Sequence, residues 1–323
     1  MNSSFVNKVF SASEVDFYQL VDELYLFQFE NNPVYKGFCE AISPQRGILS
    51  GYPFLPISFF KTHKIVSGLF DPVIVFESSG TSGQQQSRHF VKSMDLYERS
   101  FLNGFETFYG HPSDWCFLGL LPSYLERGGS SLIYMVDKLM QVSHHPSNGF
   151  YLHEHGQLSQ TLQQLERNRQ KTMLFGVTYA LLDFAEEYQL PLHHTTIIET
   201  GGMKGRREEL IREEVHGHLQ KSFGLKPVHS EYGMTELMSQ AYSKGHGIFH
   251  CPPWMRVLVR DEDDPFHIKA TGKGAINIID LANIYSCSFI ATDDIGEVFE
   301  DGSFKVLGRM DNSDVRGCSL LSL

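Results

Sequence analysis

The sequence predicts an α/β fold, in which a mostly parallel sheet covered by helices is followed by a small β-rich subdomain. In the middle of the chain, short apolar runs of strand length alternate with helical stretches. This alternation is typical of a sheet with right-handed crossovers. In the last third, the apolar runs are separated by Gly and Asp instead, which favours hairpins. Hydrophobic residues make up 41% of the chain and charged residues 20%, as expected for a globular protein.

The strands of the α/β part are expected in four apolar runs, namely residues 73–76, 116–121, 173–177 and 196–198. The clearest helix is expected at about residues 206–223. Its apolar residues recur every four positions and share one face: Ile211, Val215, Leu219 and Phe223. We expect this helix to pack on the sheet.

The β-rich part is expected in four short strands, at residues 257–259, 275–279, 296–299 and 304–307. Asp301 and Gly302 lie between the last two and indicate a hairpin turn. We therefore divide the chain into an α/β core (1–253), a small β-rich subdomain (254–308) and a hinge with a short tail (309–323).

Composition excludes several classes of protein. The formal charge of −11 argues against nucleic-acid binding, because a phosphate backbone requires a basic surface. Five cysteines without a CxxC pair favour a reducing compartment over a disulfide framework. The first ten residues lack a signal-peptide pattern, and no apolar run reaches the roughly 18 residues of a membrane span. We expect a soluble, cytoplasmic protein.

A Ser/Gly-rich segment, residues 78–83 (SSGTSG), directly follows the first expected strand. Its glycines let backbone N–H groups approach a phosphate, and its hydroxyl groups add donors. The segment lacks the Gly-Lys-Ser/Thr ending of a Walker loop and is not GxGxxG, which disfavours a P-loop NTPase and a dinucleotide fold. On composition alone, an ordinary loop remains the alternative.

Two further segments carry candidate nucleotide ligands. In residues 230–236 (SEYGMTE), a Tyr beside Gly offers a face for stacking on a base, and a Thr and a Glu follow for phosphate and Mg²⁺. In residues 291–296 (ATDDIG) and 308–311 (GRMD), carboxylates at a strand end and an arginine suit a ribose diol. Taken singly, each segment also fits a capped or solvated turn.

In order and spacing, these segments resemble the adenylate-forming superfamily of acyl-CoA synthetases, luciferases and peptide-synthetase adenylation domains. The resemblance covers roughly residues 70–317, and a Gly-Gly turn at Gly201 and Gly202 completes the pattern. It implies the fold of that superfamily's N-terminal domain and ATP with Mg²⁺ as cofactors. Only residues 312–323 follow the hinge position, so we expect the C-terminal lid domain to be absent or vestigial.

The resemblance also implies roles for individual residues. The β- and γ-phosphates of ATP would lie in the loop formed by Ser79, Gly80, Thr81, Ser82 and Gly83. Gly201, Gly202 and Tyr232 would sandwich the adenine. Thr235 would contact the α-phosphate, and Glu236 would bind Mg²⁺. Asp294 and Arg309 would bind the ribose hydroxyls, and Asp311 would mark the hinge.

Two departures from the superfamily pattern narrow the resemblance. The phosphate loop continues as QQQSR instead of Pro-Lys-Gly, and Arg88 is a candidate replacement for the missing lysine. The lysine-bearing lid is also missing. With the segment LPISFFK at residues 55–61, these features resemble the acyl-protein synthetase branch, the ligase of the bacterial bioluminescence fatty acid reductase complex. In that branch a cysteine near the C-terminus carries the acyl group, and Cys318 matches its position.

The resemblance therefore implies an ATP-dependent acid–thiol ligase. Its substrate would be a fatty or other carboxylic acid, and its partner an acyl-accepting reductase or carrier protein. Coenzyme A is a further alternative as the acyl acceptor, and an oligomer is compatible with the sequence. Two alternatives stay open, a non-catalytic nucleotide- or acyl-binding scaffold and an ATP-independent acyltransferase. The paired histidines lack zinc-ligand spacing, and the SxxK at residues 58–61 lacks its companion motifs.

Overall fold

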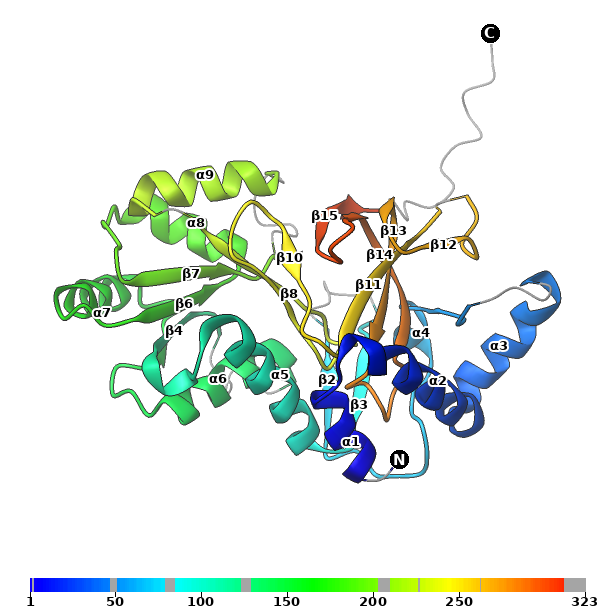
Figure 1. The fold of residues 1–323 in the computed structure, drawn as a ribbon. Coiled ribbons are helices and arrows are strands. Elements are labelled where there is room, and N and C mark those ends of the chain that lie inside the picture. Colours follow the sequence, from blue (N-terminus) through cyan, green and yellow to red (C-terminus); the bar gives the residue numbers. More distant parts are fainter. Residues whose placement is uncertain are drawn as a thin grey trace, which may run out of the picture.

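The computed structural model describes residues 1, 3–46, 51–78, 85–122, 129–202, 210–225, 227–261 and 263–310. Within them, thirteen strands form one continuous sheet, and two more form a separate hairpin. Along the sheet the strand order is β12-β11-β13-β14-β15-β10-β9-β8-β7-β6-β4-β5, with β1 pairing beside β14. The predicted α/β class with a β-rich part is confirmed (Figure 1).

One half of the sheet is parallel and is covered by helices on both faces. Its strands are β4 (Cys116–Leu120), β5 (Gly149–Phe150), β6 (Thr172–Gly176), β7 (Thr195–Glu199) and β8 (His229–Tyr232). Its helices are α5 (Met94–Tyr109), α6 (Ser131–Ser143), α7 (His155–Arg167), α8 (Thr178–Glu187) and α9 (Arg212–Phe223), with a 3₁₀ turn η1 (Pro112–Asp114). Figure 1 shows α8 and α9 on one face and α5 and α6 on the other.

Alternating side chains explain why both faces are covered. Successive residues of a strand point to opposite faces, so Phe117 and Met173 join the core cluster that contains residues of α5 and α6. Leu118 and Leu174 join a second cluster with residues of α7, α8 and α9. Burial on both faces accounts for the near-continuous apolar runs that the sequence shows here.

The other half of the sheet is antiparallel and forms the β-rich part. Its strands are β11 (Met255–Arg260), β12 (Ile268–Lys269), β13 (Gly272–Asp280), β14 (Phe289–Val298) and β15 (Phe304–Arg309). Strands β9 (Ala241–Ser243) and β10 (Phe249–His250) connect the two halves, because β9 pairs with β8 and β10 pairs with β15. The predicted hairpin at Asp301 and Gly302 joins β14 to β15, and Gly302 has a φ of 77°.

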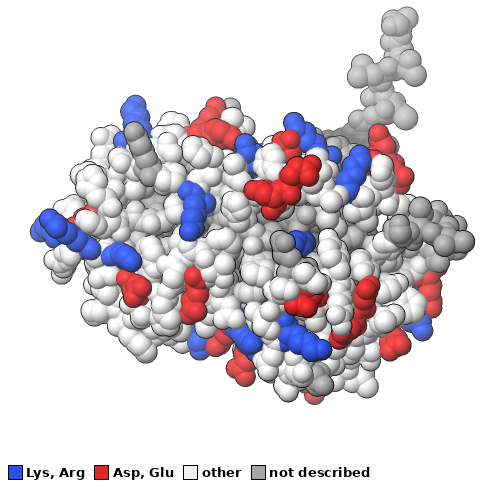
Figure 2. All heavy atoms as spheres, viewed as in Figure 1, with Lys and Arg blue, Asp and Glu red and all other residues white. Residues whose placement is uncertain are grey.

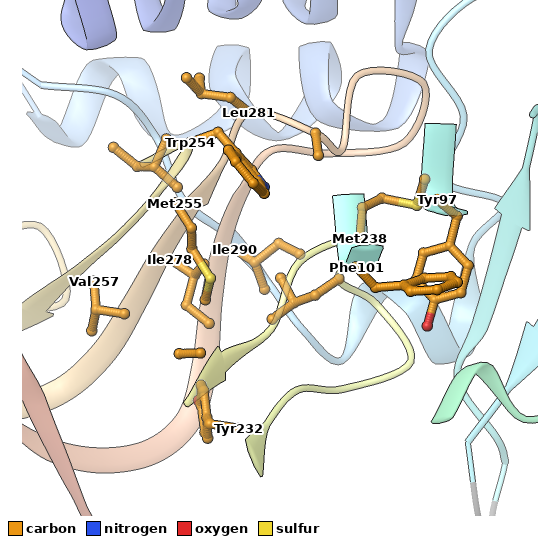
Figure 3. Packing of buried hydrophobic residues seen from close by; sticks show 14 of the residues in the cluster. Tyr97, Phe101, Tyr232, Met238, Trp254, Met255, Val257, Ile278, Leu281 and Ile290 are labelled. Atoms are coloured by element: carbon orange, nitrogen blue, oxygen red, sulfur yellow. The ribbon is translucent and has the colours of Figure 1, made fainter. Parts of the chain in front are cut away.

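The N-terminal helices pack on the β-rich part. They are α1 (Ser3–Phe10), α2 (Glu14–Asn31) and α3 (Pro33–Arg46), followed by β1 (Leu55–Pro56) and the short helix α4 (Phe59–Thr62). Strand β1 pairs in parallel with β14, and Phe10 packs edge-on against Trp254 with ring centroids 5.0 Å apart. Figure 3 shows the core near Trp254, where α5, β11, β13 and β14 contribute side chains.

The expected strand at residues 73–76 takes a different place from the one we predicted. It forms β2 (Ile74–Glu77), which pairs only with β3 (Arg88–Val91) in a separate two-stranded antiparallel sheet. Its burial is partial, with Phe76 alone fully buried among its four residues. A short apolar run therefore predicted a strand correctly but could not identify the strand's partner.

Candidate functional site

The predicted Gly-Gly turn lies where the parallel strand β7 ends. Gly201 and Gly202 have φ values of 77° and 97°, which disfavour any residue with a Cβ. Glu199, the last residue of β7, pairs with Ser230 of the neighbouring strand β8. The turn therefore lies beside the residues that end β8, at the carboxyl edge of the parallel strands. In open α/β sheets this edge is where ligands bind.

Tyr232 ends β8 and its ring is buried beside two phenylalanines. The ring centroid lies 5.3 Å from that of Phe304 and 5.8 Å from that of Phe249. Only 8% of Tyr232 is exposed, and its hydroxyl group donates a hydrogen bond of 2.8 Å to Asp294 Oδ2. Burial, and then the Asp294 carboxylate, raise the pKa of the Tyr232 phenol well above its ordinary value, so the phenol stays protonated and donates.

Asp294 connects Tyr232 to Arg309. The antiparallel register of β14 and β15 places Asp294 opposite Arg309. Arg309 Nε donates to Asp294 Oδ1 at 3.1 Å, and the Arg309 side chain is 62% exposed. We expected the carboxylates at a strand end, but Asp294 lies in the middle of β14. The strand extends further than its apolar pattern indicates because buried residues such as Thr292 continue it.

The segment after β8 is fixed by two buried side chains from distant parts of the chain. His89 of β3 lies with Nδ1 2.8 Å from the Thr235 carbonyl oxygen. Asn283, in the loop between β13 and β14, donates 2.8 Å to the carbonyl of Glu236. Burial lowers the pKa of His89 to about 4, although hydrogen bonds with Thr235 and Asn283 oppose it. The imidazole is therefore neutral, and its Nδ1–H donates to Thr235.

Glu236 is buried, with 5% of its surface exposed. Burial raises the pKa of its carboxyl group, and a hydrogen bond from Ser87 and the charges of Lys61 and Arg309 oppose that rise. Glu236 is therefore a buried carboxyl group on which the positive charges of Lys61 and Arg309 act. Among the residues that the structure describes, no three His, Cys, Asp or Glu side chains are grouped to hold a metal ion.

Arg88 is the predicted residue that the structure does not bring to this group. It is exposed on β3, opposite Glu77 in the hairpin, and its guanidinium lies 5.6 Å from the centroid of the Phe90 ring. Its neighbours Ser87 and His89 are the ones that point toward Glu236 and Thr235. Other predicted residues lie outside the described ranges, namely Ser79, Gly80, Thr81, Ser82, Gly83, Asp311 and Cys318.

Several residues at the site have no recognisable local signal in the sequence. Lys61 and Ser87 lie in the segments LPISFFK and QQQSR, but neither they nor His89 were predicted to approach the segment 235–236, which they do because β3 and α4 fold against it. Glu199 is different, because it lies two residues before the Gly-Gly turn. A carboxylate at the end of an apolar strand was a signal for a side chain that accepts a hydrogen bond from the backbone of the turn, as Glu199 does from the Gly201 N–H. The candidate ligands of the site therefore come from several elements and not from a single one.

The described part of the chain has the fold of the N-terminal domain of the adenylate-forming ligases. This fold brings together the turn after β7 and the aromatic and charged groups after β8 and in β14. The resemblance inferred from the sequence is thus confirmed at the level of the superfamily. No protein-family profile matches the chain.

Individual relatives agree with this class. A long-chain-fatty-acid–luciferin-component ligase of Vibrio harveyi is 23% identical over 330 residues, covering 94% of this chain and 86% of that protein. The structure of 2-hydroxyisobutyryl-CoA ligase in the postadenylation state superposes with a TM-score of 0.65 at 11% identity, over 94% of this chain and 70% of that one. ATP-bound MatB from Rhodopseudomonas palustris gives 0.54 at 17% identity over 73% of this chain, which spans about half of MatB (47%).

Surface charge and helix composition add two observations. On the face shown in Figure 2, Lys and Arg are interspersed with Asp and Glu and do not gather in one basic area. No helix within the described ranges has the length and apolar character needed to cross a lipid bilayer.

Proposed function

We propose that this protein is an ATP-dependent ligase that activates a carboxylic acid, most simply a fatty acid, as an acyl-adenylate and then passes the acyl group to a thiol. The observation that carries the proposal is the hydrogen-bonded group of Tyr232, Asp294 and Arg309 beside the turn at Gly201 and Gly202. The similarity to a fatty-acid ligase of Vibrio harveyi supports the choice of acid.

The geometry supports nucleoside recognition by Asp294. Tyr232 binds one carboxylate oxygen and Arg309 the other, which fixes the carboxylate and leaves further lone pairs on both oxygens. A carboxylate held in this way accepts two hydrogen bonds from a ribose diol. The exposed guanidinium of Arg309 is accessible to the same sugar. The glycine turn leaves room for a flat base because neither residue has a side chain.

Glu236 is the proposed protein ligand for Mg²⁺. This ion keeps waters and phosphate oxygens in its shell and needs only one or two protein carboxylates, so a single buried carboxyl group fits it. When bound, the ion neutralises charge on the phosphates during attack by the substrate carboxylate. Thr235, whose carbonyl His89 fixes, is the proposed contact to the α-phosphate.

The second step is acyl transfer to sulfur. The thiolate attacks the acyl carbonyl carbon, a C–S bond forms, the C–O bond to AMP breaks, and AMP leaves with the electron pair. The thiol proton goes to solvent. Cys318 is the proposed acceptor within the chain, and a thiol of a reductase or carrier protein is the proposed next one. Arg88 remains a proposed counter-charge for phosphate.

The first test is acid-dependent exchange of labelled pyrophosphate into ATP, across a panel of fatty and aromatic acids. We expect exchange with one class of acid, and a fall of about ten- to hundred-fold in Asp294→Ala, because a hydrogen bond to a charged group contributes about 1.5–3 kcal/mol. Two matched controls should exchange like the unmodified protein. They are Tyr242→Phe, at another buried tyrosine, on β9, and Glu297→Gln, at a half-exposed carboxylate on β14.

The outcome with no acid-dependent exchange would favour a non-catalytic scaffold. Acyl transfer from a preformed donor that survives Tyr232→Ala would favour an ATP-independent acyltransferase. For the second step, labelled fatty acid and ATP should leave a hydroxylamine-sensitive label on the protein. We expect Cys318→Ser to abolish this label and Cys251→Ser, at a half-buried thiol, to retain it.

A further inference from the structure

Four buried polar side chains from four elements meet at the turn that follows β7. Each is less than 8% exposed. They are Thr178, the first residue of α8, Glu199, the last residue of β7, His216 of α9 and Ser230 of β8. We call these residues the Glu199 cluster. Ser230 begins the segment 230–236, but the sequence resemblance implied no role for any of the four residues.

The contacts of this cluster converge on the backbone of Gly201. Glu199 Oε1 accepts a hydrogen bond of 2.8 Å from the Gly201 N–H and another from the Thr178 hydroxyl group. The Thr178 N–H in turn donates 3.0 Å to the Gly201 carbonyl. Both polar groups of the Gly201 backbone are therefore bound by the Glu199 cluster.

The other carboxylate oxygen anchors Glu199 to the neighbouring elements. Glu199 Oε2 accepts from the Ser230 hydroxyl group at 3.4 Å and lies 3.9 Å from His216 Nε2. Burial opposes ionisation of Glu199, but hydrogen bonds from His216 and Thr178 and the charge of Arg212 hold its pKa below the ordinary value. Glu231 of β8 is a nearby acidic group, and burial, followed by the negative charge of Glu199, raises its pKa.

Burying a carboxylate costs free energy of desolvation, which hydrogen bonds must offset, so an apolar residue would be more favourable if packing were its only role. Here those bonds go to a turn of two glycines, the residues that lose the most backbone freedom when they are ordered. The cluster therefore restricts the turn before any ligand binds, and pre-ordering a binding segment lowers the entropy lost on binding.

We propose that Glu199 is a positioning residue that, with Thr178, holds the turn at Gly201 and Gly202 in the conformation that receives the purine base of the nucleotide. This inference rests on the proposed function, because it assigns the base to the same turn. It adds that base recognition depends on side chains that do not touch the nucleotide. The ligand class is a purine nucleotide, and polyphosphate alone does not need the turn.

The test compares binding of ATP and of tripolyphosphate by titration calorimetry in the full chain. We expect Glu199→Leu to weaken ATP binding about ten-fold or more and to leave tripolyphosphate binding unchanged. Glu199→Gln should stay within a few-fold of the original affinity, because its amide oxygen can still face Gly201 and Thr178 while its NH₂ group faces Ser230 and His216. Thr178→Val, a milder change, should weaken ATP binding in the same selective way if the leucine variant does not fold.

Glu166→Leu is a matched control at the opposite end of the same strand. Glu166 of α7 accepts backbone hydrogen bonds of 2.9 and 3.0 Å from His193 and His194, just before β7 begins. We expect it to lower the free energy of unfolding without changing ATP affinity. A second readout needs no ligand: amide exchange of Gly201, followed by NMR with labelled glycine, should accelerate in Glu199→Leu and Thr178→Val but not in Glu166→Leu.

The outcomes separate the two proposals. If the unmodified protein binds ATP and the Glu199 and Thr178 variants bind it equally well, the positioning role is wrong and the proposed function stands. Equal loss of ATP and tripolyphosphate binding would also overturn the positioning role, since it would indicate general damage. If the unmodified protein binds tripolyphosphate but not ATP, both the proposed nucleotide chemistry and this inference fail.

Discussion

Glu231 is a carboxyl group whose environment opposes its charge. It lies on β8 opposite Tyr242 of β9, and its charge also acts on Tyr97 and Tyr109 of α5. Burial first, and then the negative charge of Glu199, raise the pKa of Glu231 to about 8. A Cβ at Gly233 would lie 2.2 Å from Glu231 Oε1, so a larger residue there would require the Glu231 side chain to move.

The pH dependence of stability should report this group. Between the pKa of an unfolded glutamate, about 4.3, and about 8, the folded protein keeps a proton that the unfolded chain has lost. The contribution of Glu231 to stability is therefore full at low pH and is lost as pH rises through this interval. Glu231→Gln should thus become more stable relative to the unmodified protein from pH 4.5 to pH 8, by about 1.4 kcal/mol for each pKa unit of difference.

Urea unfolding at a series of pH values measures this difference. Glu297→Gln on β14 is the control, since its side chain is half-exposed. A constant difference between the Glu231 variant and the unmodified protein across the interval would contradict the assignment of the raised pKa to Glu231.

At the scale of elements, local patterns predicted individual strands better than their partners. Residues 116–121, 173–177 and 196–198 form β4, β6 and β7, as predicted, because a short continuous apolar run is typical of a strand that is buried on both faces of a sheet. Partners depend on long-range pairing that no local window contains. Residues 73–76 pair with β3 instead of the large sheet, and Asp294 meets Arg309 only through the register of β14 and β15.

The candidate site also contains residues that local motifs predicted and residues that only long-range contacts bring to the site. Tyr232, Asp294, Arg309, Gly201 and Gly202 were predicted from motif spacing and lie in adjoining elements, although their roles remain proposals. Apart from Glu199, the side chains that hold these motifs in place come from elsewhere in the chain and could not be predicted. Only the tertiary fold brings them to the site. His89, for example, forms its hydrogen bond with Thr235, which lies 146 positions further along the sequence.

The link between β3 and the segment after β8 should weaken in acid. The buried His89 has a pKa of about 4, whereas an unfolded histidine titrates near 6.5. Below about pH 6.5 the unfolded chain binds a proton that the folded protein refuses, so stability falls between about pH 6.5 and 4. His89→Asn retains a donor near the position of Nδ1, and we expect it to lose less stability over this interval.

Thermal or urea unfolding from pH 4 to 7 provides the measurement, and His63→Asn at an exposed position of the same region is the control. Parallel pH profiles for the His89 variant and the unmodified protein would show that another group causes the acid sensitivity.

At the scale of the whole molecule, one sheet contains both the α/β part and the β-rich part that we predicted from the pattern of apolar runs. The pairing of β10 with β15 places Phe249 opposite Phe304, and both rings pack near Tyr232. The N-terminal helices complete the β-rich part through buried polar contacts. Gln28 of α2 donates to the carbonyl groups of Asn283 and Ile284 at 2.9 and 3.0 Å, and its Oε1 accepts from the Ser288 N–H at 2.9 Å.

Replacing Gln28 should therefore affect the whole fold. Gln28→Leu leaves buried carbonyl groups and the Ser288 N–H without partners, at a cost of about 1–3 kcal/mol for each unpaired group. We expect a clear fall in the free energy of unfolding, measured with urea, in a single cooperative transition. Gln19→Leu, on the exposed face of the same helix, should change it little. Equal stability of the two variants would show that α2 is held by its apolar contacts alone.

The pairing of β1 with β14 also bears on how the chain folds as it is synthesised. Leu55 and Pro56 lie beside Ile290 and Ala291, and Gln28 reaches the loop at Asn283. Gln28 and β1 therefore have no complete partner until more than two hundred further residues have been made. Contacts of such high sequence separation slow folding and leave apolar helices uncovered in the meantime. Among nascent chains, we expect holding chaperones to stay bound to α2 and β1 until β14 has been synthesised.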